Sequence, residues 1–155
     1  HRQRAEVLLD SIVQITGIPQ DFQAMPPDSS SRQIWTHRTE SVFLDTFGRP
    51  DPNQDPPCER TGESTVVQSL HLMNSERLYA DVVSDRGLAK QLADGGKSAD
   101  ELAVQLYRTI FSRDPVADER QLVRSLLEAE SANRRQVLED LIWAMLNSAE
   151  FAIQD

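Results

Sequence analysis

The chain has 155 residues, 39% of them hydrophobic, and a formal net charge of −9 from 25 acidic and 16 basic residues. This length and apolar content suffice for one globular domain, residues 1–155, with a buried core. The acidic charge argues against a nucleic-acid-binding protein, which needs a basic surface for phosphate contacts, and against docking on anionic lipid.

The sequence also limits the chemistry and the location of the protein. No apolar run approaches the length of a membrane span, so no membrane insertion is expected. The chain opens in a helical pattern without a visible signal peptide, as a fragment of a longer protein would. Cys58 is the one cysteine, so no intrachain disulfide can form. With His37 and His71 it is insufficient for a structural zinc site, and we expect neither a metal nor a cofactor in this domain.

The first predicted helix covers residues 3–16. Its apolar residues recur at the three-and-four spacing of one buried helix face, and they are Ala5, Leu8, Leu9, Ile12 and Val13. Gly17 is predicted to end this helix as a C-cap.

A proline-rich segment, residues 17–63, follows the first helix. It holds seven of the eight prolines and is predicted to be irregular, with a possible extended piece in RQIWTHR (32–38). The stretch SVFLDTFG predicts a short helix that begins at Thr39 or Ser41. A connection of this length is usually functional or packed against another part of the protein.

The rest of the chain has the pattern of consecutive helices. The predicted segments are 63–74, 75–85, 86–96, 98–114, 116–130 and 133–148. The expected core face of the segment at 116–130 comprises Leu122, Val123, Leu126 and Leu127. The fold class predicted is therefore all-α, a bundle of about six to seven helices with a long Pro-rich irregular insertion after the first.

Local signals predict where some of these helices begin and end. Ser98 and Glu101 form a capping-box pattern. Asp114 and Pro115 have the pattern of an N-cap followed by proline at the first helical position. Ser131 is expected to open the last helix, and Gly95–Gly96 to end the helix before Ser98.

The candidate functional residues lie mostly in the proline-rich segment. Cys58 with His71 is the minimum for thiol catalysis, but no third group that would orient the histidine can be identified. A partly buried loop cysteine and a hydrogen-bonded histidine at a helix–loop contact are the alternative. Four carboxylates also occur there, as expected by chance in so acidic a chain, and they are Asp51, Asp55, Glu59 and Glu63.

Two arginines flank residues 50–59 of this segment. Arg49 and Arg60, with Glu59 beside Arg60, are interpreted as an ion-pair clip that holds the loop against the helices; alternatively, they present a small anion-binding site. Trp35 and Trp143 are candidates for contact with a partner or a sugar ring, and core packing is the alternative.

Several stretches together resemble a known family. RAEVLLDSIVQITGIP, FLDTFGRPDP, CERTGESTVVQSLHLMNSERL, LAVQLYRTIFSRDPVADE and LEDLIWAMLNSAEF are similar, in this order, to the planctomycete-type C-terminal domain of unknown function. The resemblance implies a place at the end of large exported proteins that often carry a separate cytochrome-c-like domain, and therefore an extracytoplasmic location. It also implies an association with polysaccharide handling. It transfers no catalytic residue, and Pro56 stands where many relatives have the first cysteine of Cys-x-Cys-Glu-Arg.

A second resemblance covers the C-terminal part. LYRTIFSRDPVADE and LNSAEF look like the helical repeat of bacterial extracellular proteins and phycobilisome linkers. There the motif implies a packing device, in which Arg113 and Asp114–Pro115 turn the chain between helices and Phe151 closes the core.

These observations favour a non-catalytic helical interaction or structural module at the C-terminus of a larger exported multidomain protein. Its partners would be neighbouring domains of the parent chain, another protein or a polysaccharide. The alternative is part of a carbohydrate-active or redox enzyme. In that case Arg49, Glu59, Arg60 and His71 would line a cleft that a neighbouring domain completes.

Overall fold

The computed structural model describes residues 4–23, 25–27, 29–34, 39–49 and 72–152. Within these ranges all regular structure is helical and no strand occurs, so the predicted all-α fold class is confirmed. In chain order the elements are α1 (Ala5–Thr16), η1 (a 3-10 helix, Ser31–Gln33), α2 (Val42–Thr46), α4 (Glu76–Val82), α5 (Leu88–Asp94), α6 (Ala99–Phe111), α7 (Ala117–Leu127), α8 (Arg134–Leu146) and α9 (Ala149–Ala152).

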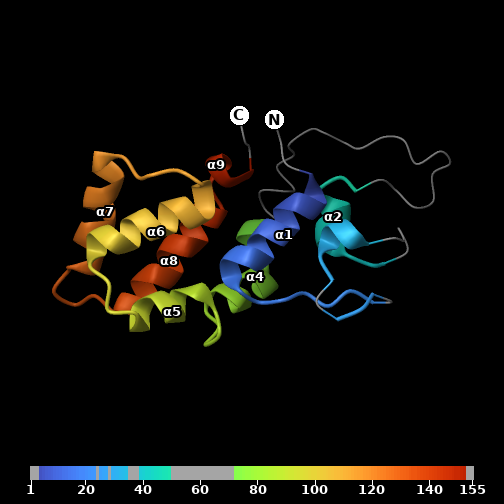
Figure 1. Cartoon of the computed structure of the whole chain (residues 1–155), viewed down its shortest axis with the longest axis horizontal. Coiled ribbons are helices and arrows are strands. Elements are labelled where there is room, and N and C mark those ends of the chain that lie inside the picture. Colours follow the sequence, from blue (N-terminus) through green and yellow to red (C-terminus); the bar gives the residue numbers. More distant parts are fainter. Residues whose placement is uncertain (1–3, 24, 28, 35–38, 50–71, 153–155) are drawn as a thin grey trace.

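The helices form an elongated molecule (Figure 1). α6, α7 and α8 gather at one end, while α1 packs against η1 and α2 at the other. α5 contacts both α8 and α1, and α4 contacts α8, so these two short helices join the ends. Buried apolar residues from α1 through to Phe151 in α9 belong to one continuous core cluster.

α1 forms where the sequence predicts it. Its core face carries Leu8, Leu9, Ile12 and Ile15, each at most 4% exposed. Gly17 ends the helix in the left-handed conformation, with φ of 74°, and its N–H donates to the carbonyl of Val13. This conformation costs glycine little because glycine has no Cβ, and the predicted C-cap is confirmed.

The proline-rich segment is anchored to α1 through Asp10. One carboxylate oxygen of Asp10 accepts hydrogen bonds from the N–H and the hydroxyl of Ser31, both at 2.6 Å, and the other pairs with Arg32 Nε at 2.7 Å. Ser31 is 1% exposed. This anchor explains why Arg32 and Gln33 lie in a 3-10 turn, so the predicted extended conformation is wrong for these two residues.

The short helix α2 also lies within this segment. Its N-cap is Ser41, one of the two residues at which the sequence predicts the helix to begin. The Ser41 hydroxyl accepts from the N–H of Leu44 at 3.3 Å. Leu44 is fully buried and fixes α2 to the core.

The C-terminal helices begin partly at other residues than predicted. The capping box of Ser98 and Glu101 is present at the start of α6. α7 begins only after Val116, because Asp114 pairs with Arg108 and the Glu119 carboxylate accepts from the Val116 N–H at 2.8 Å. α8 likewise begins after Asn133, whose side chain accepts from two backbone N–H groups, and not at Ser131.

The core face predicted for α7 is also partly wrong. Val123 is the buried residue of this helix, whereas Leu122 is 53% and Leu126 40% exposed. α7 packs on α6 and α8 along one side and lies at the edge of the molecule (Figure 1). Its apolar stripe is therefore wider than the face that the described neighbours cover.

Candidate functional site

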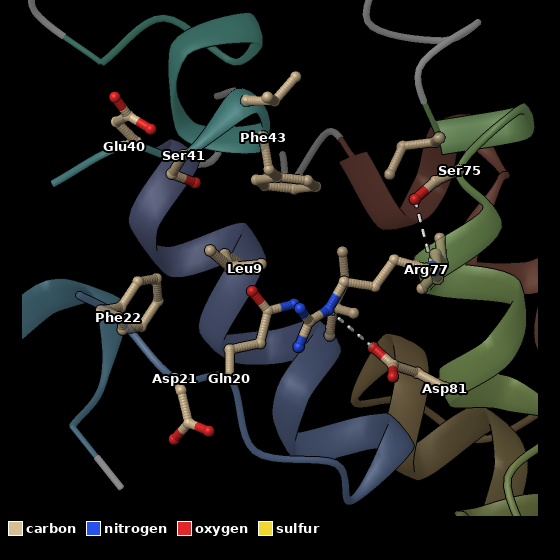
Figure 2. Close-up of a pocket in the computed structure, with 14 residues that line it drawn as sticks. Leu9, Gln20, Asp21, Phe22, Glu40, Ser41, Phe43, Ser75, Arg77 and Asp81 are labelled. Atoms are coloured by element: carbon tan, nitrogen blue, oxygen red, sulfur yellow. Dashed lines mark hydrogen bonds and ion pairs between the residues drawn. The ribbon is translucent and has the colours of Figure 1, made fainter. Parts of the chain in front are cut away.

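A pocket of about 290 Å³ lies beside α1, between α2, α4 and the segment that follows α1. Figure 2 shows its lining side chains. Its apolar walls consist of Leu9, Ile12, Phe22, Val42, Phe43, Leu72 and Leu78. Its polar groups are Gln20, Asp21, Glu40, Ser41, Ser75, Arg77 and Asp81. Half of the lining residues are apolar and half are polar, so the pocket combines apolar walls with groups that can orient a small ligand.

One wall of the pocket depends on how α2 is held. The Ser41 cap and the buried Leu44 fix the orientation of the helix, and Phe43 then faces the pocket (Figure 2). The Phe43 ring stacks on the ring of Phe47, with centroids 4.4 Å apart. Because Phe47 is itself buried, the aromatic wall has a rigid support.

The opposite wall is α4, which carries the charged pair. Ser75 caps this helix by accepting from the N–H of Leu78 at 3.2 Å. Arg77 and Asp81 are four residues apart and so project from the same side of the helix. Arg77 Nε lies 3.9 Å from Asp81 Oδ2, a distance that permits ion pairing but no hydrogen bond.

Asp81 is the most deeply placed acid of the pocket, at 9% exposed, whereas Asp21 and Glu40 are exposed. Burial raises the pKa of the Asp81 carboxyl above its ordinary value, and the nearby Arg77 opposes this shift. The desolvated carboxylate thus retains unused capacity to accept hydrogen bonds.

The described lining residues supply carboxylates, hydroxyls, an amide and a guanidinium. They include no histidine or cysteine, and the hydroxyls of Ser41 and Ser75 accept the capping hydrogen bonds of their helices. In the described part of the chain, no group of three or more His, Cys, Asp or Glu side chains is arranged to hold a metal ion. No helix in these ranges is long and apolar enough to cross a membrane.

Of the candidate residues predicted from the sequence, Arg49 and Trp143 are described. Trp143 is half-buried and packs against the core, and its ring lies edge-on to that of Tyr79 with centroids 5.7 Å apart. The Arg49 side chain is 5% exposed and does not line the pocket. The guanidinium donates to the carbonyl of Thr39 at 2.8 Å and pairs with Asp45 at 2.6 Å. Arg49 thereby ties the end of α2 to the chain that enters it.

The other candidates lie outside the described residues. They are Trp35, Cys58, Glu59, Arg60 and His71. The predictions for these residues, including the ion-pair clip with Arg60, stay predictions.

The sequence reasoning missed the pair of Arg77 and Asp81. The sequence does contain an indication of this pair. Asp81 directly precedes Val82 and follows Leu78 by one helical turn, and both apolar residues lie on the buried face of α4. An acid on the apolar face of a helix indicates a buried charge. Its role in a pocket depends on α1 and α2, which lie far away in the sequence.

A second polar cluster lies at the other end of the molecule, around Arg113. The guanidinium pairs with Glu119 through two hydrogen bonds of 2.8 Å and with Glu150 at 2.5 and 3.0 Å. It also lies over the rings of Tyr107 and Phe111, 5.1 and 5.6 Å from their centroids. Arg113 thus joins α6, α7 and α9. Phe151, which follows Glu150 in α9, is 3% exposed and belongs to the core.

The fold and the pocket together define an all-helical protein with a small acidic and aromatic pocket and arginine-based links between its helices. The chain belongs to the PSD1 family, described as protein of unknown function (DUF1553), whose model matches residues 1–127. α8 and α9 lie beyond the matched residues, yet they contribute Leu138, Ile142 and Phe151 to the core. Comparison with the curated proteins and with the solved structures gave no match.

Proposed function

We propose that this chain is a non-catalytic helical module of a larger exported multidomain protein, and that it packs against a neighbouring domain or a protein partner through α7. The observation that carries the proposal is the outward apolar face of this helix. Leu122 and Leu126 are four residues apart on one face, and about half of each side chain is open to solvent. Side chains of this type on a helix at the edge of a fold favour a docking surface.

The use of arginine in the described residues supports a structural role. Arg49, Arg113 and Arg135 each bind both a carboxylate and a backbone carbonyl. These side chains hold segments of the fold together and are already engaged. The family resemblance supports the remaining parts of the proposal, an extracytoplasmic location and a link to polysaccharide handling.

The test measures binding of the chain to the remainder of its parent polypeptide by titration calorimetry. Each half-exposed leucine contributes about 1–1.5 kcal/mol when it is covered. Replacing both leucines, Leu122→Ser and Leu126→Ser, should therefore weaken binding by roughly 30- to 150-fold. Gln121→Ser, an exposed polar change on the same helix, is the matched control and should leave binding unchanged.

The double variant also loses the buried part of each leucine, so it should unfold at a lower urea concentration than the wild type, and affinities are compared without urea once circular dichroism has shown that the variant is folded. Equal affinity of the double variant and the wild type would refute α7 as the docking surface. Absence of binding by the wild-type chain would refute packing against a neighbouring domain of the parent polypeptide.

A further inference from the structure

The pocket beside α1 has an excess of negative charge. Three of its lining residues are acids, namely Asp21, Glu40 and Asp81, and Arg77 is the one base among the described lining residues. Asp21 and Glu40 are exposed, whereas Asp81, on α4, is buried. Together the three carboxylates give the pocket a negative potential, which favours positively charged ligands.

Among the described residues, no donor lies within hydrogen-bond distance of the buried carboxylate. Arg77 Nε, 3.9 Å from Asp81 Oδ2, is too far away for a hydrogen bond. The Arg77 side chain is 61% exposed, and it extends across the pocket toward Gln20 (Figure 2). A buried carboxylate without a hydrogen-bonded partner is costly, and a ligand donor that reaches it recovers this cost.

The walls around this carboxylate are apolar and aromatic. Phe22 and Phe43 belong to different segments, and Leu9 of α1 lies between them and Asp81 in Figure 2. Aromatic faces attract a cation and also cover an apolar body. The volume of about 290 Å³ is at the lower end of small-molecule sites, which hold roughly 300–1,000 Å³. The size therefore favours a small molecule over a polymer.

We propose that this pocket binds a small organic ammonium ion with an apolar body, whose ammonium group donates to Asp81 and whose body packs against Phe22, Phe43 and Leu9. Arg77 competes with the ligand for Asp81 and swings into solvent when the ligand binds. This site goes beyond the proposed docking role. It lies on α1, α2 and α4, away from α7, so either proposal can fail without the other.

The experiment uses titration calorimetry with 2-phenylethylammonium as the probe. Two molecules with the same aromatic body serve as comparisons, neutral 2-phenylethanol and anionic 3-phenylpropionate. The ammonium compound should bind at least about tenfold more tightly than the alcohol, and the anion should not bind measurably. Equal binding of the ammonium compound and the alcohol would overturn the role of charge.

Two substitutions on α4 should change the affinity in opposite directions. Asp81→Asn removes the charge and should weaken binding by about tenfold or more, whereas Arg77→Gln removes the competitor and should strengthen binding several-fold. Asp94→Asn is the control, because it makes the same change in net charge at a distant exposed carboxylate. An effect of Asp94→Asn equal to that of Asp81→Asn would overturn the site.

The Asp81→Asn variant is expected to fold. Burial raises the pKa of Asp81, so the fold tolerates the neutral form better than the charged one. A neutral amide of the same shape should leave the unfolding midpoint at neutral pH unchanged or higher. If this folded variant retains wild-type affinity for the ammonium probe, the proposal is wrong. A lysine-containing peptide that bound more tightly than 2-phenylethylammonium would likewise overturn the assignment to small molecules.

Discussion

The arginine cluster at the end of α6 provides the sharpest test of how this fold is stabilised. In the variant Arg113→Ala, the guanidinium that links α6, α7 and α9 is removed. The partly buried pair with Glu119 is expected to contribute about 1–2 kcal/mol after allowance for solvent screening. The more exposed pair with Glu150 contributes roughly 0.2–1 kcal/mol. Contact with the rings of Tyr107 and Phe111 contributes about 0.5–1 kcal/mol.

The expected loss in the free energy of unfolding is therefore about 3 kcal/mol. For a protein of this size such a loss lowers Tm by roughly 6–12 °C. The assay is urea unfolding at neutral pH followed by far-ultraviolet circular dichroism, with a thermal melt as the second measurement. The slope of the urea transition should stay constant, because the surface exposed on unfolding does not change.

The matched control is Arg108, near the end of α6. Arg108 pairs with Asp114 across the exposed surface, and its side chain is 64% exposed. Arg108→Ala should therefore destabilise far less than Arg113→Ala. The variant Arg113→Lys keeps the charge but loses the planar fork that reaches both carboxylates, and it should recover less than half of the loss. Equal effects of Arg108→Ala and Arg113→Ala would refute the reasoning, since net charge alone would then account for both.

Three further predictions concern other parts of the fold. Arg49→Ala should lower the free energy of unfolding by about 1–3 kcal/mol in urea, because a buried guanidinium then no longer satisfies a carbonyl and a carboxylate. Hydrogen bonds from Arg113 lower the pKa of Glu119, so its contribution to stability is present above its unfolded pKa and is lost as the pH falls through its folded pKa. Urea midpoints measured down the acid range should fall less in Glu119→Gln than in the wild type; parallel curves would contradict this. Gly87→Ala should destabilise by about 1–3 kcal/mol in a thermal melt, because the new Cβ would lie 3.0 Å from one backbone carbonyl and 3.2 Å from that of Ser84.

Much of the fold follows from local signals in the sequence. The apolar spacing of α1, its terminal glycine and the capping box at Ser98 act within a few residues, and each occurs where it is predicted. The start of α7 fails as a prediction because Asp114 is a good N-cap by type, yet it is engaged by Arg108 from the preceding helix. That competition depends on the conformation of the turn that follows α6, which the residue type of Asp114 alone does not give.

The candidate pocket also follows only in part from local signals in the sequence. Ser41 and Ser75 cap their helices by local rules, but the pocket exists because two short helices meet α1 from distant parts of the chain. The exposure of Leu122 and Leu126 was also beyond local reasoning. Their spacing predicts an apolar helix face that is covered by another surface. Which surface covers this face depends on the tertiary arrangement.

The link between Arg113 and Glu150 has a consequence for synthesis on the ribosome. The two residues are 37 positions apart in the chain, whereas Glu119 follows Arg113 by six. At about 5–20 residues per second, Glu150 is added roughly 2–7 s after Arg113. Until α9 has been synthesised, Arg113 can pair with Glu119 but not with Glu150. α9 therefore completes a cluster whose first half, the contact of Arg113 with Glu119, needs no residue beyond α7.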